Sequence, residues 1–161
     1  MRTIISTNGL PILVDDEDFE RLSAVTWWVR KDGYVSRTVM VDGVKTSLKI
    51  HRMVLNLQAG VPFLVDHING NRADNRKANL RVCTHAQNAW NMGKAATNTT
   101  GYKGVSMMAN GRFVAQIRCH GRKYHLGCFG TPEEAHEVYC LAADMLHGEF
   151  SNYGRKEVVN G

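Results

Sequence analysis

An alternating stretch followed by a capped helix constrains the fold of this chain more than any other feature. Residues 112–120, RFVAQIRCH, place an apolar residue at every second position. A period of two predicts a β-strand with one apolar face and one largely polar face. In residues 122–129, RKYHLGCF, we expect a second strand of this kind, with Tyr124 and Leu126 facing inward to the core.

The next segment, TPEEAHEVYCLAADMLHG at 131–148, is predicted to form a helix. Thr131 is a suitable N-cap, Pro132 fits the first turn, and Glu134 completes a capping box. Gly148 fits the C-terminal stop. An apolar stripe at helical spacing would pack this helix on one face of the sheet. The other face of the sheet would then stay open, and that face carries basic residues.

The first 60 residues contain short apolar runs that Asp32-Gly33 and Asp42-Gly43 punctuate as hairpin turns would. We expect antiparallel strands here, followed by a short helix at 51–57. Trp27 and Trp28 cannot both face one side of a strand. The acidic run at 15–18 is interpreted as a helix cap or a solvated surface rather than a metal site. The fold class is therefore α+β.

Charge is distributed unevenly along the chain, whose formal net charge is +5. Residues 66–130 contain 10 Lys or Arg against only two acidic residues, whereas residues 131–149 contain five acids and no Lys or Arg. A basic surface of this kind favours an anionic partner, of which nucleic acid is the commonest. No apolar run approaches the length of about 18 residues that a membrane span needs, so no membrane partner is expected.

Cysteine spacing points to a reduced compartment. The four cysteines stand at 83, 119, 128 and 140 and form no C-x2-C pair, so neither a zinc knuckle nor a disulfide framework is indicated. We therefore expect reduced thiols and a cytoplasmic location.

Residues 64–91, LVDHINGNRADNRKANLRVCTHAQNAWN, contain side chains of the kinds that phosphodiester hydrolysis needs. Hydrolysis of a phosphodiester needs a base for the attacking water and a positive charge at the phosphate. A histidine such as His67 can take the proton. Carboxylate and amide oxygens, as in Asp66 and Asn88, are the ligands that Mg²⁺ prefers. The other asparagines and glycines of the loop are interpreted as turn formers.

The pattern 66-DH-67, 79-NLR-81 and 87-QN-88, preceded by 51-HR-52, resembles the HNH endonucleases of the ββα-metal fold, most closely their phage homing-type branch. The resemblance implies that Asp66 and Asn88 bind one Mg²⁺ or Mn²⁺ ion. It implies that His67 is the general base and that Asn79 orients its ring. His51 stands where the family keeps a histidine, and we favour a structural role for it.

A second resemblance covers the C-terminal part. The motifs 102-YKGV-105, 113-FVAQIR-118, 126-LGCF-129 and 131-TPEEA-135 are similar to the AP2/ERF DNA-binding domain. The resemblance implies a three-stranded sheet that binds double-stranded DNA, with a helix behind it. Ser106, Met108 and Asn110 depart from plant members, so their DNA specificity is not implied. Across both parts, the predicted DNA contacts are Arg72, Arg76, Arg81, Lys103, Arg112, Gln116, Arg118, Lys123 and His125.

These inferences predict a bipartite DNA endonuclease of phage type, acting in a bacterial host cell as a monomer on DNA, with a dimer as the alternative. The expected organisation is an HNH domain at 1–92 (N-terminal strands 1–50, HNH core 51–92), a linker at 93–100, an AP2-like domain at 101–154 and a tail at 155–161. A DNA-binding regulator that does not cleave is the alternative function. An RNA-directed nuclease ranks below both, because the outward sheet face lacks aromatic residues for stacking bases.

Overall fold

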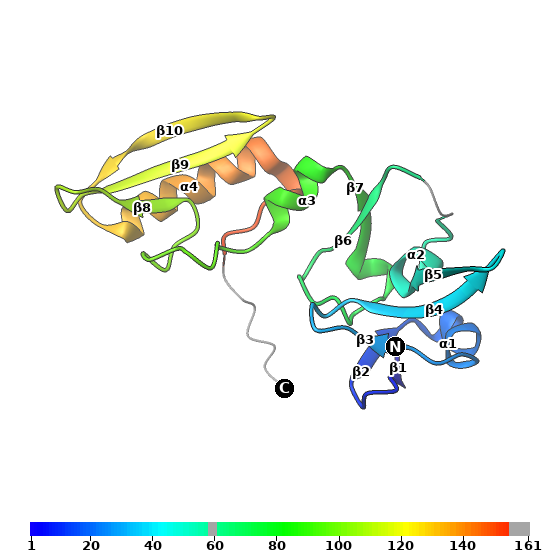
Figure 1. The fold of residues 1–161 in the computed structure, drawn as a ribbon. Helices are drawn as coiled ribbons and strands as arrows, with labels where there is room; N and C mark the ends of the chain where they lie inside the picture. The colour runs from blue at the N-terminus through cyan, green and yellow to red at the C-terminus, as the bar shows by residue number, and fades with distance from the viewer. Residues whose placement is uncertain (58–60, 155–161) are drawn as a thin grey trace. The chain divides into compact units, whose positions relative to one another are not determined.

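The computed structural model describes residues 1–57 and 61–154, and the predicted tail at 155–161 lies outside them. The chain divides into two compact units, Met1–Cys83 and Thr84–Gly161. Figure 1 shows that each unit combines small antiparallel sheets or hairpins with helices, which confirms the predicted α+β class. Among the described residues, no helix is long and apolar enough to cross a membrane.

The first unit begins with a hairpin whose second strand is one of the apolar runs expected to form antiparallel strands, whereas its first strand was not predicted. Strand β1 (Arg2–Ile5) pairs antiparallel with β2 (Pro11–Val14), and helix α1 (Asp16–Ser23) follows. The acidic run occupies the start of α1, with Asp16, Glu17 and Asp18 in its first turn. Acidic side chains at a helix N-terminus interact favourably with the helix dipole, which accounts for this cluster without a metal.

A three-stranded antiparallel sheet follows, made of β3 (Trp28–Val29), β4 (Val35–Val41) and β5 (Val44–Lys49) in that order. Asp42 and Gly43 both have positive φ, at 49° and 78°, which confirms the predicted hairpin turn. Helix α2 (Ile50–Val54) is the predicted short helix. Trp27 is buried and Trp28 is exposed, so the two rings do face opposite sides.

The last hairpin of this unit carries the predicted nuclease residues. Strand β6 (Leu64–His67) pairs antiparallel with β7 (Leu80–Cys83), and a 3-10 turn, η1 (Lys77–Asn79), leads into β7. The hairpin packs through Val65 and Leu80 onto the core of the unit. The rest of that core comprises Ile4, Ile12, Val14, Leu22, Trp27, Val29, Val35, Ile50 and Val54.

The second unit contains helix α3 (His85–Asn91) and a three-stranded antiparallel sheet packed on helix α4 (Pro132–His147). The sheet has the order β10-β9-β8, with β8 at Val105–Met107, β9 at Phe113–Cys119 and β10 at Arg122–Phe129. A 3-10 turn, η2 (Gly148–Phe150), follows α4. The capping box predicted at Thr131 is present, and so is the one that Thr84, with Gln87 three residues later, predicts at the start of α3.

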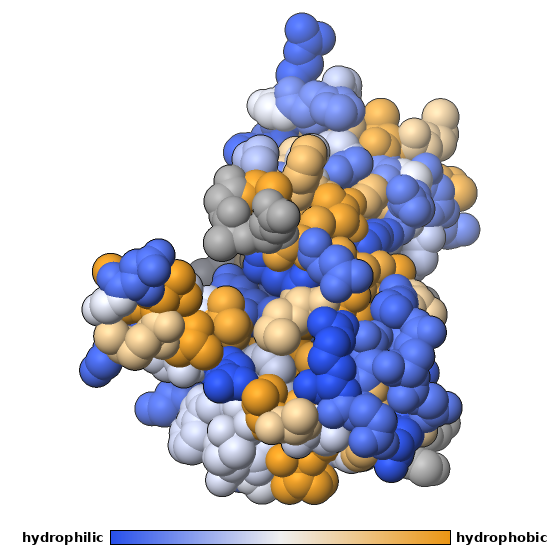
Figure 2. Space-filling model, turned by 90° about the vertical axis from the view of Figure 1, so that its right-hand side faces the viewer, coloured by the Kyte–Doolittle hydropathy of each residue, from blue (hydrophilic) through white to orange (hydrophobic). Residues whose placement is uncertain are grey.

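The predicted alternation is confirmed on β9, where Ala115, Ile117 and Cys119 are buried. Tyr124 lies directly opposite Ile117 and so shares its face, but it is 41% exposed. The prediction that Tyr124 is a core residue was therefore wrong, because β10 is an edge strand and its outer side chains reach solvent. On the side of the molecule drawn in Figure 2, hydrophobic side chains lie in small groups among hydrophilic ones.

Candidate active site

His67 occupies the end of β6 and is almost fully buried. Its Nε2 lies 3.3 Å from Oδ1 of Asn75, which is also fully buried. A carboxamide oxygen can only accept a hydrogen bond, so this contact requires the proton on Nε2. In that tautomer Nδ1 is the basic nitrogen of the ring.

The surroundings of His67 favour its uncharged form. Burial lowers the pKa of His67, although the hydrogen bond with Asn75 and the charge of Asp66 act in the opposite direction. An uncharged imidazole at neutral pH can accept a proton, as a general base must.

Two further rings surround His67. Its centroid lies 5.3 Å from that of His51, edge to face, and 6.0 Å from that of Tyr34. Burial, with the neighbouring His67, lowers the pKa of His51 to about 3, so this ring also stays uncharged. Nδ1 of His51 is buried and has no hydrogen-bond partner in the described part of the chain. His51 therefore adds no positive charge beside the base.

The loop between β6 and β7 is organised around the buried carboxylate of Asp74. The Arg76 side chain donates two hydrogen bonds to it, at 2.7 and 2.6 Å, and the Asn69 side chain donates another at 3.0 Å. Burial alone would raise the pKa of Asp74, but these hydrogen bonds and the charge of Arg76 lower it. Asn79 donates to the Asp74 carbonyl at 2.8 Å and accepts from the Asn69 amide at 3.0 Å.

These contacts place the two asparagines in different positions. The side-chain hydrogen bonds of Asn79 go to the loop, whereas Asn75 contacts the ring of His67. The role predicted for Asn79 as the residue that orients His67 stays a prediction. Sequence reasoning missed Asn75, since it counted this residue among the turn formers and its neighbours Asp74 and Arg76 look like ordinary loop residues.

The N-terminal hairpin holds the loop in place. Leu13 on β2 accepts a hydrogen bond from the Asn75 amide at 2.8 Å and donates one to the Ala73 carbonyl at 2.9 Å. A short parallel bridge thus joins β2 to the segment that carries Asn75. Residues at the start of the chain therefore fix a side chain that contacts His67.

The three arginines of this unit that were predicted to contact DNA each bind a group of the protein. Arg81 donates through Nε and Nη2 to Asp66 Oδ2, at 2.9 and 2.8 Å. Arg72 donates to the Asp32 carbonyl at 2.6 Å, and its guanidinium carbon lies 4.4 Å from the centre of the Tyr34 ring. Arg76 pairs with Asp74. The DNA contacts predicted for these three arginines stay predictions.

The predicted metal ligands lie on β6 (Asp66) and α3 (Asn88), which belong to different units, and the pair stays a prediction. Within residues 1–57 and 61–154, no group of three or more His, Cys, Asp or Glu side chains could hold a metal ion. The predicted pair of a carboxylate and an amide is of another kind, and its hard oxygen donors suit Mg²⁺.

The DNA contacts predicted for the second unit fall into two groups. Lys103, Gln116, Arg118 and Lys123 line one pocket. Arg112 lies elsewhere and donates to the Cys128 carbonyl at 2.7 Å, and His125 Nε2 lies 3.6 Å from the Cys128 sulfur.

Comparison with known proteins supports a nuclease. The family model described as HNH endonuclease matches residues 48–90, a segment that contains Asp66, His67, Asn79 and Asn88. An uncharacterized HNH endonuclease of Acanthamoeba polyphaga mimivirus, L560, is 30% identical over 134 residues, which cover 81% of this chain and 67% of the relative. The chain belongs to the HNH endonuclease family.

A phage protein is a further relative. Protein 3.8 of Escherichia phage T7 is 27% identical over 92 residues, which cover 56% of this chain and 75% of that protein. No solved structure matches the chain. The family match ends before the C-terminal sheet, so the AP2-like assignment of that sheet stays a proposal.

Proposed function

We propose that this protein is a metal-dependent endonuclease that hydrolyses phosphodiester bonds in double-stranded DNA, with His67 as general base. The observation that carries the proposal is the buried imidazole of His67, held at Nε2 by Asn75 and adjacent to Asp66, in surroundings whose burial lowers its pKa. This arrangement lies within the segment that matches the HNH endonuclease family.

In the proposed reaction, Nδ1 of His67 takes a proton from the attacking water. The water oxygen bonds to phosphorus as the bond to the 3′-oxygen breaks, and the leaving oxygen gains a proton from solvent. The products are a 5′-phosphate and a 3′-hydroxyl. Asn75 holds the imidazole through the opposite nitrogen, so it acts as a positioning residue, and Asn79 stiffens the loop that presents Asn75.

Asp66 and Asn88 are the residues that we propose to hold one Mg²⁺ or Mn²⁺ ion. A bound ion would neutralise charge on the phosphate and the leaving oxygen. Arg81 fixes the Asp66 carboxylate through two hydrogen bonds to Oδ2, which limits the orientations that this carboxylate can take.

We propose that the C-terminal sheet binds the duplex in the manner of an AP2-like domain. Its three antiparallel strands packed on one helix agree with that architecture. The cations Lys103, Arg118 and Lys123, together with Gln116, lie close enough to line one site. In this proposal these residues bind the DNA, and the residues of the HNH segment cleave it.

A plasmid assay tests the proposal. Supercoiled DNA that carries the flanks of the gene is incubated with the wild type, with His67→Ala, or with His85→Ala as an exposed-histidine control. Relaxation that needs Mg²⁺ or Mn²⁺, stops in EDTA and is lost only in His67→Ala is the expected result. Cleavage by His67→Ala at the wild-type rate would refute the assignment of the base. Binding in EDTA without any cleavage in metal would instead identify a regulator.

A further inference from the structure

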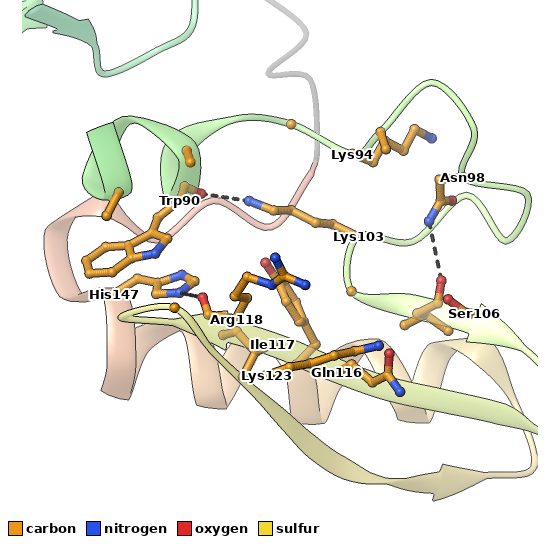
Figure 3. A pocket seen from close by; sticks show the side chains of 18 of the residues that line it. Trp90, Lys94, Asn98, Lys103, Ser106, Gln116, Ile117, Arg118, Lys123 and His147 are labelled. Atoms are coloured by element: carbon orange, nitrogen blue, oxygen red, sulfur yellow. Dashed lines mark hydrogen bonds between the residues drawn. The ribbon is translucent and has the colours of Figure 1, made fainter. Parts of the chain in front are cut away.

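A pocket of about 500 Å³ lies within the second unit. Its walls come from α3, the 93–98 segment, the start of β8, the β9–β10 hairpin and α4. Figure 3 shows Lys94 and Asn98 on the loop side of the pocket and Gln116, Arg118 and Lys123 on the strand side, with Trp90 and His147 at one end. A concave site of this size can enclose a small ligand or one unit of a polymer.

Among the residues that the structure describes, the charged side chains of the pocket are all basic. Lys94, Lys103, Arg118 and Lys123 line it, and no acidic residue of that part of the chain does. Lys103 reaches inward and donates to the Trp90 carbonyl at 2.7 Å, and burial lowers the pKa of its ammonium group to about 8. Within the described residues no carboxylate forms an ion pair with Lys103. Lys103 is partly buried, and a cation withdrawn from water without a counter-ion is costly, so an anionic ligand would relieve part of that cost.

The register of the hairpin brings two further cations, both exposed, next to one another. Lys123 lies directly opposite Arg118 in the β9–β10 pair, and like charges in that position destabilise a sheet. Neither side chain forms an ion pair in the part of the chain that the structure describes. Gln116, two residues along the same face, makes no side-chain hydrogen bond with the described residues. Three polar groups therefore face the pocket without protein partners.

An apolar wall faces these cations. Ala86 and Ala89 of α3 line the pocket. Trp90 stacks on His147 with ring centroids 4.6 Å apart, and His147 Nε2 lies 3.0 Å from the Arg118 carbonyl, which fixes this end. A ligand that fills the whole site needs an anionic part for the cations and a flat or apolar part for the α3 wall. A nucleotide has both.

We propose that this pocket holds a single unpaired nucleotide of the DNA substrate, with its phosphate toward Lys103 and Arg118 and its base toward Ala86 and Ala89. The inference rests on the proposed function and extends it. A duplex lying across the sheet would contact the surface of the sheet but would not fill the pocket, whereas a nucleotide that leaves the duplex could. A paired base must break its pair and leave its stack to enter such a pocket, at a cost of about a few kcal/mol, and this cost is smaller for an unpaired base.

The test compares binding of two labelled duplexes to the full chain in EDTA, one fully paired and one with a single unpaired nucleotide. We expect the wild type to bind the second duplex about tenfold more tightly or better, a factor that corresponds to about 1.4 kcal/mol. Ala89→Phe fills the pocket from an exposed helix position without changing charge, and it should abolish this preference.

Two arginines of the same hairpin provide a matched pair. Arg118→Ala should weaken binding and lower the salt slope by about 0.9, the effect of one phosphate contact. Arg122→Ala should change neither, because Arg122 is exposed on the same hairpin but does not line the pocket. Thermal unfolding of each variant confirms that it folds.

Equal affinity of the wild type for the two duplexes, or a preference that survives Ala89→Phe, would overturn the proposal. Equal effects of Arg118→Ala and Arg122→Ala would do so as well. Because binding is measured in EDTA, it is independent of cleavage. Loss of plasmid cleavage with the preference intact would refute the nuclease and leave the pocket standing.

Discussion

Replacing Asn75 with alanine tests how His67 is held. The change removes a carboxamide whose Oδ1 lies 3.3 Å from His67 Nε2 in a fully buried site. A hydrogen bond to a charged group is worth about 1.5–3 kcal/mol, and the long separation favours the lower end. The imidazolium forms only as the proton is taken. We therefore expect kcat for plasmid nicking to fall about tenfold, at about 1.4 kcal/mol per factor of ten, with KM for DNA unchanged.

Two variants separate positioning of the ring from general loosening of the loop. Asn75→Asp keeps an oxygen acceptor and should recover most of the lost kcat. Asn69→Ala removes a hydrogen bond to Asp74 without touching His67, so it should lower the unfolding temperature more than kcat. The reasoning fails if Asn75→Asp nicks as slowly as Asn75→Ala, or if Asn69→Ala reproduces the tenfold loss.

Three further predictions concern stability. Gly104→Ala should lower the free energy of unfolding, measured by urea denaturation, more than Gly121→Ala does. Both glycines have positive φ, but of the two only Gly104 would bring a Cβ against a ring, that of Tyr139, at 2.0 Å. The positive φ costs about 1–2 kcal/mol at either position, and overpacking at Gly104 adds about 1–3 kcal/mol. The stability of the wild type relative to Lys103→Met should rise as pH increases from about 8 toward 10.5, because the folded pKa of Lys103 is lowered to about 8 and deprotonation removes the partly buried charge. Asp74→Asn should be destabilised at neutral pH, and the difference should shrink as pH falls below about 4, because the lowered pKa of Asp74 stabilises the fold only while it is ionised. A constant difference across either pH range would contradict the corresponding prediction.

Local patterns in the sequence predicted much of the fold. Capping boxes at Thr84 and Thr131, the turn at Asp42-Gly43 and the alternation of β9 each depend on neighbouring residues, and the structure contains all of them. Tyr124 departs from the prediction because its exposure depends on β10 being an edge strand, which is a property of the whole sheet.

The candidate site was predictable only in part. The Asp66-His67 pair stands out through adjacency and spacing, and both residues are buried at the end of β6. The contact of Asn75 with His67 depends on a loop conformation that Asp74 and Leu13 set together. Leu13 is about 60 residues away along the chain, and no local pattern links an apolar strand residue to the orientation of an imidazole.

That link through Leu13 sets a lower limit on the length of chain that could be excised, or transplanted to another protein, and still hold the candidate site together. A cassette of residues 48–90 would carry every residue of the family signature, yet it would leave the Ala73 carbonyl and the Asn75 amide without the strand that binds them. Grafting the signature onto another scaffold therefore requires a substitute for β2, an extended segment that offers one donor and one acceptor beside the loop. The inherited motif and the physical unit that makes it rigid have different boundaries in this protein.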